Sequence, residues 1–290
     1  MARTTRRLDD VVAERANLTR SQARSLILAG RVRVDGRPAT KAGTSVAAAA
    51  AVEIERPAAF VSRGGEKLDA ALGDFGLDVA RLRALDVGAS TGGFTDCLLK
   101  RGAESVVALD VGYGQLAHAL RIDPRVTVVE RTNFRLLADG ALGPPFDLVT
   151  IDASFISVVT ILGRARAFLA PDGRIVALVK PQFEAGRDRI GGGGVVRDPE
   201  VHRAILAEVR AKLAPLALVP THVVRSALVG PAGNAEFFAL VRHAVSAGSL
   251  APFDDEAIAT ALRGGGRDLA GDEPGLPAGP DAPGAAQRST

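Results

Sequence analysis

The sequence contains no tryptophan, one cysteine, one tyrosine and one methionine among 290 residues, and aromatic residues make up only 4% of it. The lone cysteine, Cys97, excludes an internal disulfide and a zinc site built on a cysteine cluster. No apolar run approaches the roughly 20 residues of a membrane span, and the charged N-terminus does not resemble a signal peptide. We therefore expect a soluble cytoplasmic protein with an aliphatic core, no metal, no membrane association and no obligate protein partner.

Positive charge is concentrated at one end of the chain. Residues 1–65 hold 12 lysines and arginines against six acids, net +6, whereas the remainder holds 24 (36 − 12) against 27 (33 − 6), net −3. A basic module in front of a slightly acidic body predicts a polyanion-binding end, with RNA or DNA as the usual partner. Charge alone fits a merely arginine-rich surface equally well.

The basic end carries helical and hairpin patterns. Apolar residues at helical spacing follow Arg6, a T-x-x-Q capping box at Thr19 opens a second helix, and Asp35-Gly36 makes a tight turn in RVRVDGRPA. The arginines of these elements predict a phosphate-binding face on one side of the unit, without aromatic residues to stack on bases. The predicted RNA contacts are Arg6, Arg20, Arg24, Arg31, Arg33 and Arg37.

The stretch from Leu85 to Gln115 organises the rest of the chain. It follows the order of an apolar strand, a turn of small residues, a helix and a second apolar strand that ends on Asp110. Small residues let backbone N–H groups approach a nucleotide, and the acid holds ribose hydroxyls. Asp110 follows Gly88 by 22 residues (110 − 88), near the spacing of about 20 expected for that contact. The turn lacks the G-x-G-x-x-G pattern of a dinucleotide site, which favours S-adenosylmethionine.

The residues predicted to hold this cofactor come from three places. We expect the backbone of the glycine loop to face the methionine part, Asp110 the ribose, and Asn133 with Phe134 the adenine. The full set is Gly88, Ala89, Ser90, Thr91, Gly92, Gly93, Phe94, Asp110, Val111, Asn133 and Phe134.

Seven apolar runs alternate with helical patterns over residues 84–241. This alternation predicts an α/β fold, a doubly wound Rossmann-like sheet that is mainly parallel. The last two runs, 216–224 and 237–241, are separated by a glycine-containing loop and no helix, so we expect them to pair antiparallel. A helix is also predicted over 112–120, and a turn at residues 171–173. Most S-adenosylmethionine-dependent methyltransferases share such a seven-stranded arrangement.

Composition sets the expected domain boundaries. A small α+β module occupies residues 1–55, a linker covers 56–61, and the α/β domain covers 62–245. The remainder, 246–290, is a C-terminal extension. From about residue 264 it holds seven glycines, four prolines and two large apolar side chains, which bury too little surface to offset the entropy of ordering. We expect that part to be disordered.

The motifs of both modules resemble known families. Residues 5–55, with T-R-S-Q-A and G-R-V-R-V-D-G, are similar to the small RNA-binding domain of the ribosomal protein S-four type. Four charged residues match the K-D-K-E tetrad of ribose 2′-O-methyltransferases with the FtsJ/RrmJ fold: Lys67 in SRGGEKL, Asp152 in TIDASF, Lys180 in LVKPQFE and Glu236 in GNAEFF. Together, residues 5–242 resemble the TlyA family of bacterial rRNA (cytidine-2′-O)-methyltransferases, some of which carry the name hemolysin.

The resemblance implies ribosomal RNA as substrate and S-adenosylmethionine as methyl donor. Lys180, in its neutral form, is the predicted general base, Asp152 orients it, and Lys67 and Glu236 position the ribose. Two other functions are weighed. The first is a nicotinamide-dependent oxidoreductase, which lacks support because the dinucleotide glycines are missing. The second is an RNA-binding or membrane-lytic protein without enzymatic activity. The sequence shows no segment that looks lytic.

Overall fold

The computed structural model describes residues 5–55, 58–186 and 189–264. The chain divides into two compact units, residues 1–59 and 60–290, and each has its own hydrophobic core. Most of the tail that the composition predicts to be disordered, 265–290, lies outside the described residues, as does part of the predicted linker.

The first unit is a small α+β domain, as predicted. Its elements are β1 (Thr5–Arg7), α1 (Leu8–Ala16), α2 (Arg20–Leu28), β2 (Val32–Val34), β3 (Arg37–Pro38), β4 (Ser45–Ala47) and β5 (Val52–Ile54). β1 pairs with β4, and β2 lies between β3 and β5. The predicted capping box forms at the start of α2, where the Gln22 N–H donates to Thr19 Oγ1 and Thr19 N–H donates to Gln22 Oε1. Leu8, Val12 and Ile27 are fully buried between the elements.

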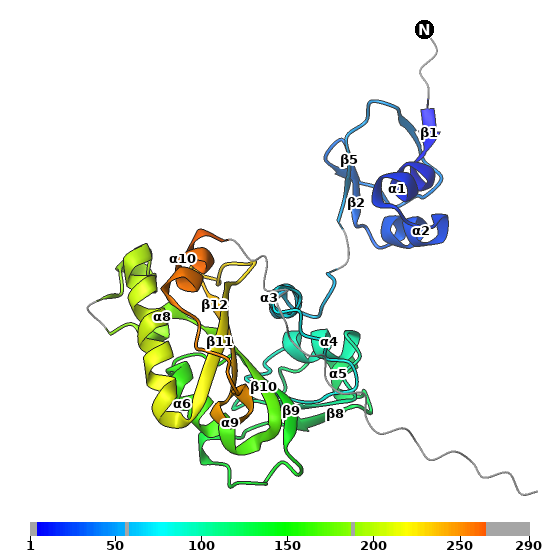
Figure 1. The fold of residues 1–290 in the computed structure, drawn as a ribbon. Coiled ribbons are helices and arrows are strands. Elements are labelled where there is room, and N and C mark those ends of the chain that lie inside the picture. Colours follow the sequence, from blue (N-terminus) through cyan, green and yellow to red (C-terminus); the bar gives the residue numbers. More distant parts are fainter. Residues whose placement is uncertain (1–4, 56–57, 187–188, 265–290) are drawn as a thin grey trace, which may run out of the picture. The chain divides into compact units, whose positions relative to one another are not determined.

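The second unit contains a seven-stranded sheet in the order β11-β12-β10-β9-β6-β7-β8 (Figure 1). The strands are β6 (Arg83–Val87), β7 (Ser105–Leu109), β8 (Val126–Val129), β9 (Phe146–Ile151), β10 (Leu169–Val179), β11 (Leu218–Arg225) and β12 (Phe237–His243). Neighbours from β10 to β8 run parallel, whereas β12 is antiparallel to both β10 and β11. This confirms the doubly wound sheet and the antiparallel final pair.

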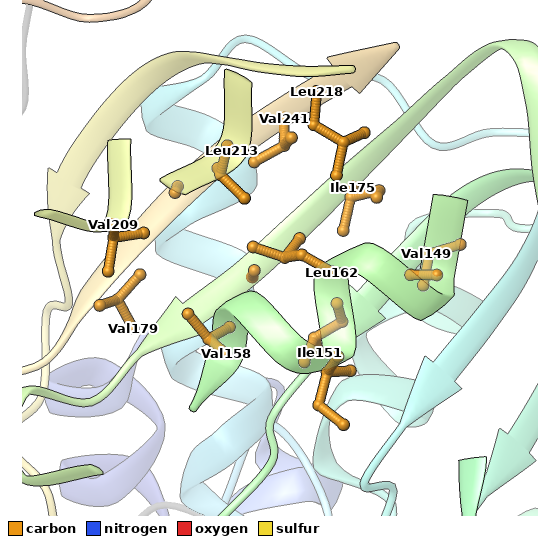
Figure 2. Close-up of a cluster of buried hydrophobic side chains, with 14 of the residues drawn as sticks. Val149, Ile151, Val158, Leu162, Ile175, Val179, Val209, Leu213, Leu218 and Val241 are labelled. Carbon is orange, nitrogen blue, oxygen red and sulfur yellow. The ribbon is translucent and has the colours of Figure 1, made fainter. Parts of the chain in front are cut away.

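Helices cover both faces of this sheet (Figure 1). One face packs on α3 (Arg63–Asp74), α4 (Gly93–Lys100) and α5 (His118–Arg121), the other on α6 (Val158–Ala165), α8 (Pro199–Leu213) and α10 (Asp255–Arg263). Two short helices, α7 (Pro181–Glu184) and α9 (Ala244–Ala247), complete the unit. Figure 2 shows Leu162 of α6 and Leu213 of α8 in one aliphatic cluster with Val149 and Ile175 of the sheet. The core is aliphatic, as the scarcity of aromatic residues predicts.

Three details differ from the sequence-based expectation. The helix predicted over 112–120 is only α5, because residues 112–115 form a loop in which Gly112 N–H donates to Asp110 Oδ1. The turn expected at 171–173 lies within β10, where the pairing register with β9 shifts between Leu169 and Arg174. Helix α10 was not predicted, although its N-terminal residue Asp254 caps it by accepting from Ala257 N–H.

Candidate active site

Two cavities open beside the loops that follow the carboxyl ends of β6, β7, β9 and β10. The larger has a volume of about 660 Å³ and the smaller about 470 Å³. Both are lined by Gly88, Ser90, Asp152, Ser154 and Phe155, so these five residues form a shared boundary. Ligands of doubly wound sheets bind at this edge.

The larger cavity holds the four predicted tetrad residues in two ion pairs. Lys180 Nζ lies 2.5 Å from Asp152 Oδ1, and Lys67 Nζ lies 2.5 Å from Glu236 Oε2. The Lys67 and Glu236 side chains are only 9% and 2% exposed. Burying a charged side chain costs free energy unless an opposite charge pairs with it. Each ion pair therefore offsets this cost for the two side chains that form it. The sequence predicted the first pair and did not predict the second.

These four residues come from distant parts of the chain. Lys67 lies on α3, Asp152 and Lys180 directly follow β9 and β10, and Glu236 directly precedes β12. The antiparallel insertion of β12 beside β10 brings the start of one strand next to the end of the other, since Val179 pairs with Phe237. That register places Glu236 and Lys180 at the same edge of the sheet.

The glycine loop between β6 and α4 permits two close backbone approaches. Gly88 has φ +86°, and a Cβ there would lie 2.5 Å from the carbonyl oxygen of Asp152. A Cβ on Gly93 would lie 2.8 Å from the backbone nitrogen of Gly65, in the first turn of α3. Only glycine fits where a backbone approaches so closely. The loop therefore joins the cofactor side of the site to both Asp152 and the helix that carries Lys67.

The smaller cavity contains the predicted ribose-binding acid. Asp110 Oδ2 accepts from Ser90 N–H at 2.8 Å, and its Oδ1 accepts from Gly112 N–H at 2.6 Å. A carboxylate has about four acceptor positions, so Asp110 keeps capacity for ribose hydroxyls. Apolar residues form much of the remaining lining, among them Val87, Leu109, Val111, Phe134, Ile156 and Ile161, beside the polar Gln115, Asn133 and Arg135. An acid beside an apolar wall fits an adenosine group.

The predicted cofactor residues divide between the two cavities. Asp110, Val111, Asn133 and Phe134 line the smaller one, and Ala89, Thr91, Gly93 and Phe94 line the larger one. Gly92 lines neither cavity and stands at the N-cap of α4 with φ +95°.

Contacts that the sequence did not predict join the loops after β9 and β10. Lys180 Nζ donates to Ser154 Oγ at 2.9 Å, and the rings of Phe155 and Phe183 lie 5.2 Å apart. Glu184 accepts from Ser157 Oγ at 2.7 Å and from the N-terminal N–H of α6, which belongs to Val158, at 2.6 Å. The motifs TIDASF and KPQFE contain all of these residues except Ser157 and Val158, but only tertiary structure shows that the two loops meet.

Asp86 lies beneath the site, fully buried in β6. It accepts from the hydroxyls of Thr95 and Thr150, at 2.7 and 3.2 Å. Burial raises the pKa of Asp86 to about 7, while the two threonine hydrogen bonds oppose that shift. The unfolded chain releases this proton near pH ~3.9, so the folded state binds more protons between that pH and about 7. Stability from this group therefore falls as pH rises through that window.

Asp86→Asn, which stays neutral, should remove this pH dependence. We expect the variant to be more stable than the wild type by roughly 1–3 kcal/mol near pH ~8, and by much less near pH ~5. The gain is smaller than the full pKa shift implies, because an amide oxygen replaces two carboxylate acceptors. Urea unfolding at both pH values measures the difference. An equal effect of the substitution at both pH values would contradict this role of Asp86.

The predicted RNA-binding arginines occupy several parts of the first unit. Arg6 pairs with Glu14 at 2.5 Å, and Arg20 and Arg24 both contact Asp9. The hairpin register pairs Arg33 with Pro38 and Val34 with Arg37. Because side chains alternate along a strand, Arg33 and Arg37 lie on opposite faces of the hairpin, contrary to the expected single face.

The described ranges contain no helix long and apolar enough to cross a bilayer. They also contain no group of three or more His, Cys, Asp or Glu side chains arranged to hold a metal ion.

The fold and the two cavities define an FtsJ-like methyltransferase. The model of that family matches residues 60–243, and the S4 domain model matches residues 6–51. The 16S/23S rRNA (cytidine-2′-O)-methyltransferase TlyA of Mycobacterium tuberculosis is 48% identical over 83% of this chain and 91% of its own length. Hemolysin A of Brachyspira hyodysenteriae is 38% identical over 80% of this chain and 98% of its own. The chain belongs to the TlyA family.

A solved structure supports the same relationship. A protein of Streptococcus thermophilus superposes with a TM-score of 0.67 at 35% identity, covering 90% of this chain and 97% of its own. The predicted family resemblance is therefore confirmed over both units.

Proposed function

We propose that this methyltransferase transfers a methyl group from S-adenosylmethionine to the ribose 2′-hydroxyl of a cytidine in ribosomal RNA. The observation that carries the proposal is the Lys180–Asp152 pair at the boundary of the two cavities. Asp152 lines both cavities. Lys180, the proposed proton acceptor, pairs with Asp152 and therefore lies next to the glycine loop between β6 and α4. The TlyA relative, named for the same reaction, supports the choice of acceptor.

The smaller cavity fits the adenosine part of the cofactor, through Asp110 for the ribose and Asn133 with Phe134 for the base. The backbone at Gly88 and Ser90 fits the methionine part, at the boundary to the larger cavity. When bound, S-adenosylmethionine supplies a methyl group already activated by its sulfonium. The protein then has to align the acceptor oxygen and remove its proton.

Lys180 is the proposed general base. Because Lys180 is ion-paired with Asp152, its ammonium must first release a proton to solvent. As a neutral amine, its Nζ then takes the proton of the 2′-hydroxyl, while Asp152 Oδ1 and Ser154 Oγ hold that nitrogen in place at 2.5 and 2.9 Å. A placed base contributes typically ~10²–10⁴-fold to the rate. Alignment of the reacting groups contributes more, about 7–11 kcal/mol in favourable cases.

Lys67 and Glu236 are the proposed ribose-positioning pair. Their 2.5 Å contact fixes one donor and one acceptor group on the wall of the larger cavity, away from bulk solvent. A ribose offers hydroxyls that both donate and accept, so a Lys–Glu pair is complementary to it. The S4 domain, with its surplus of arginines, supplies affinity for the RNA backbone.

Incubation of purified ribosomal subunits with methyl-labelled S-adenosylmethionine tests the function. We expect label in ribosomal RNA, at a cytidine whose 3′ phosphodiester bond resists alkaline hydrolysis, because a methylated 2′ oxygen cannot attack the phosphate. Subunits that already carry the modification serve as the control and should take up no label. Label on a base, on protein, or at a nucleotide that alkali still cleaves would contradict the proposal.

A further inference from the structure

One buried carboxylate in the first unit holds three arginines. The side chain of Asp9, on α1, is 0% exposed. Arg7 contacts it through Nε at 3.0 Å and Nη2 at 2.8 Å, and Arg24 and Arg20 contact it through Nε at 3.2 and 3.4 Å. The three arginine side chains are 45–52% exposed. We name Arg7, Arg20 and Arg24 the arginine fan.

The fan presents its donors outward. A guanidinium carries five N–H donors, and within the described residues Arg24 uses only its interior Nε nitrogen, on Asp9. Its two terminal nitrogens, on a half-exposed side chain, remain for a further acceptor. Arg20 is also held by Asp10, through Nε at 3.1 Å, and Asp10 is 42% exposed. Three guanidiniums against two carboxylates leave a net positive charge, so the further acceptor is an anion.

Asp9 is what permits this arrangement. Guanidiniums repel one another, and only a shared anion holds three of them together. Hydrogen bonds from Arg7, Arg24 and Arg20 keep the pKa of Asp9 well below its usual range, so the carboxylate stays charged at neutral pH. Flexible arginine side chains lose conformational entropy when they bind a ligand. Contacts with Asp9 order these side chains before binding, which reduces that loss.

We propose that Asp9 is a positioning residue for RNA binding, which holds the arginine fan as a phosphate-binding site for the RNA backbone. The guanidinium fork matches phosphate oxygens in a bidentate way, and backbone contacts need no base-stacking aromatic residues. The inference rests on the proposed function for the identity of the partner. It adds Arg7 and Asp9, neither of which the sequence analysis placed among the RNA contacts.

The test uses the full chain and a labelled RNA hairpin of arbitrary sequence at low salt. If Asp9 acted only through its charge, Asp9→Asn would strengthen binding by removing a negative charge. Loss of the ordered fan should instead weaken it about tenfold. The matched control is Glu53→Gln, which removes the same charge from an exposed position on β5, outside the fan, and should leave the affinity equal or higher. A folded Asp9→Asn variant that binds as tightly as the wild type would overturn the proposal.

A second variant keeps the test decisive if Asp9→Asn does not fold. Arg24→Gln removes one fan member at the surface and should weaken binding and make the salt dependence shallower, by about 0.7–0.9 in log–log slope. Arg15→Gln, also exposed on the first unit but outside the fan, should change both less. Equal effects of the two substitutions would contradict a site at Arg24. Wild-type methylation of ribosomal subunits is assayed on the same preparation, so loss of the proposed function and loss of the fan are told apart.

Discussion

Lys180→Ala should slow methyl transfer by about 10²–10⁴-fold while leaving the affinity for S-adenosylmethionine within about twofold of the wild type. Lys180 Nζ is held by Asp152 and Ser154 in the larger cavity, and Lys180 does not line the smaller cavity that holds Asp110. Removing the amine therefore removes the proton acceptor and spares the adenosine contacts. Single-turnover rates on ribosomal subunits and calorimetric titration with the cofactor measure the two quantities separately.

The matched control for this change is Lys212→Ala. Lys212 is 55% exposed on α8 and forms only a 3.8 Å pair with Glu208, so its loss should leave both the rate and the affinity unchanged. A Lys180→Ala variant that methylates at the wild-type rate would show that Lys180 is not the general base. The proton acceptor would then have to be sought among the other residues of the larger cavity.

The sequence predicted those parts of the structure that depend on local pattern. Strand runs that alternate with helical runs placed all seven strands of the sheet, and the Thr19–Gln22 capping box formed as expected. The predicted Lys180–Asp152 pair also formed, because two residues that directly follow neighbouring parallel strands must meet at the same edge. Hydrophobic periodicity and the residues at strand ends can both be read from short stretches of sequence, so these features were predictable.

Of three features that the sequence did not predict, one depends on distant segments and two on local backbone geometry. Lys67 and Glu236 are 169 positions apart, and their contact exists because α3 packs in one hydrophobic cluster with β12. The helix expected over 112–120 was shortened because the Asp110 carboxylate binds the backbone of residue 112, which no periodicity reveals. The side chains of Arg33 and Arg37 lie on different faces of the hairpin because the turn between them sets the pairing register. The Lys67–Glu236 contact is decided by tertiary packing, whereas a side chain–backbone hydrogen bond and a turn decide the other two.

Asp110→Ala should weaken cofactor binding by roughly tenfold to hundredfold, since hydrogen bonds to a charged group each contribute about 1.5–3 kcal/mol. The carboxylate also accepts from the N–H groups of Ser90 and Gly112, so its loss releases the glycine loop as well as the ribose. Titration of the variant with S-adenosylmethionine and with S-adenosylhomocysteine should show the same loss for both. The control is Asp139→Ala, at a carboxylate that is 77% exposed and pairs with Arg164.

The Asp110 and Lys180 variants should separate cofactor binding from proton transfer. Asp110 lines the smaller cavity and does not line the larger one that holds Lys180, so saturating cofactor should restore most of the Asp110→Ala rate. No cofactor concentration should rescue Lys180→Ala, because its defect lies in the transition state rather than in binding. If Asp110→Ala instead binds the cofactor normally and loses rate at saturation, the acid acts on the reaction itself. The assignment of cofactor binding to the smaller cavity and proton transfer to the larger one would then be wrong.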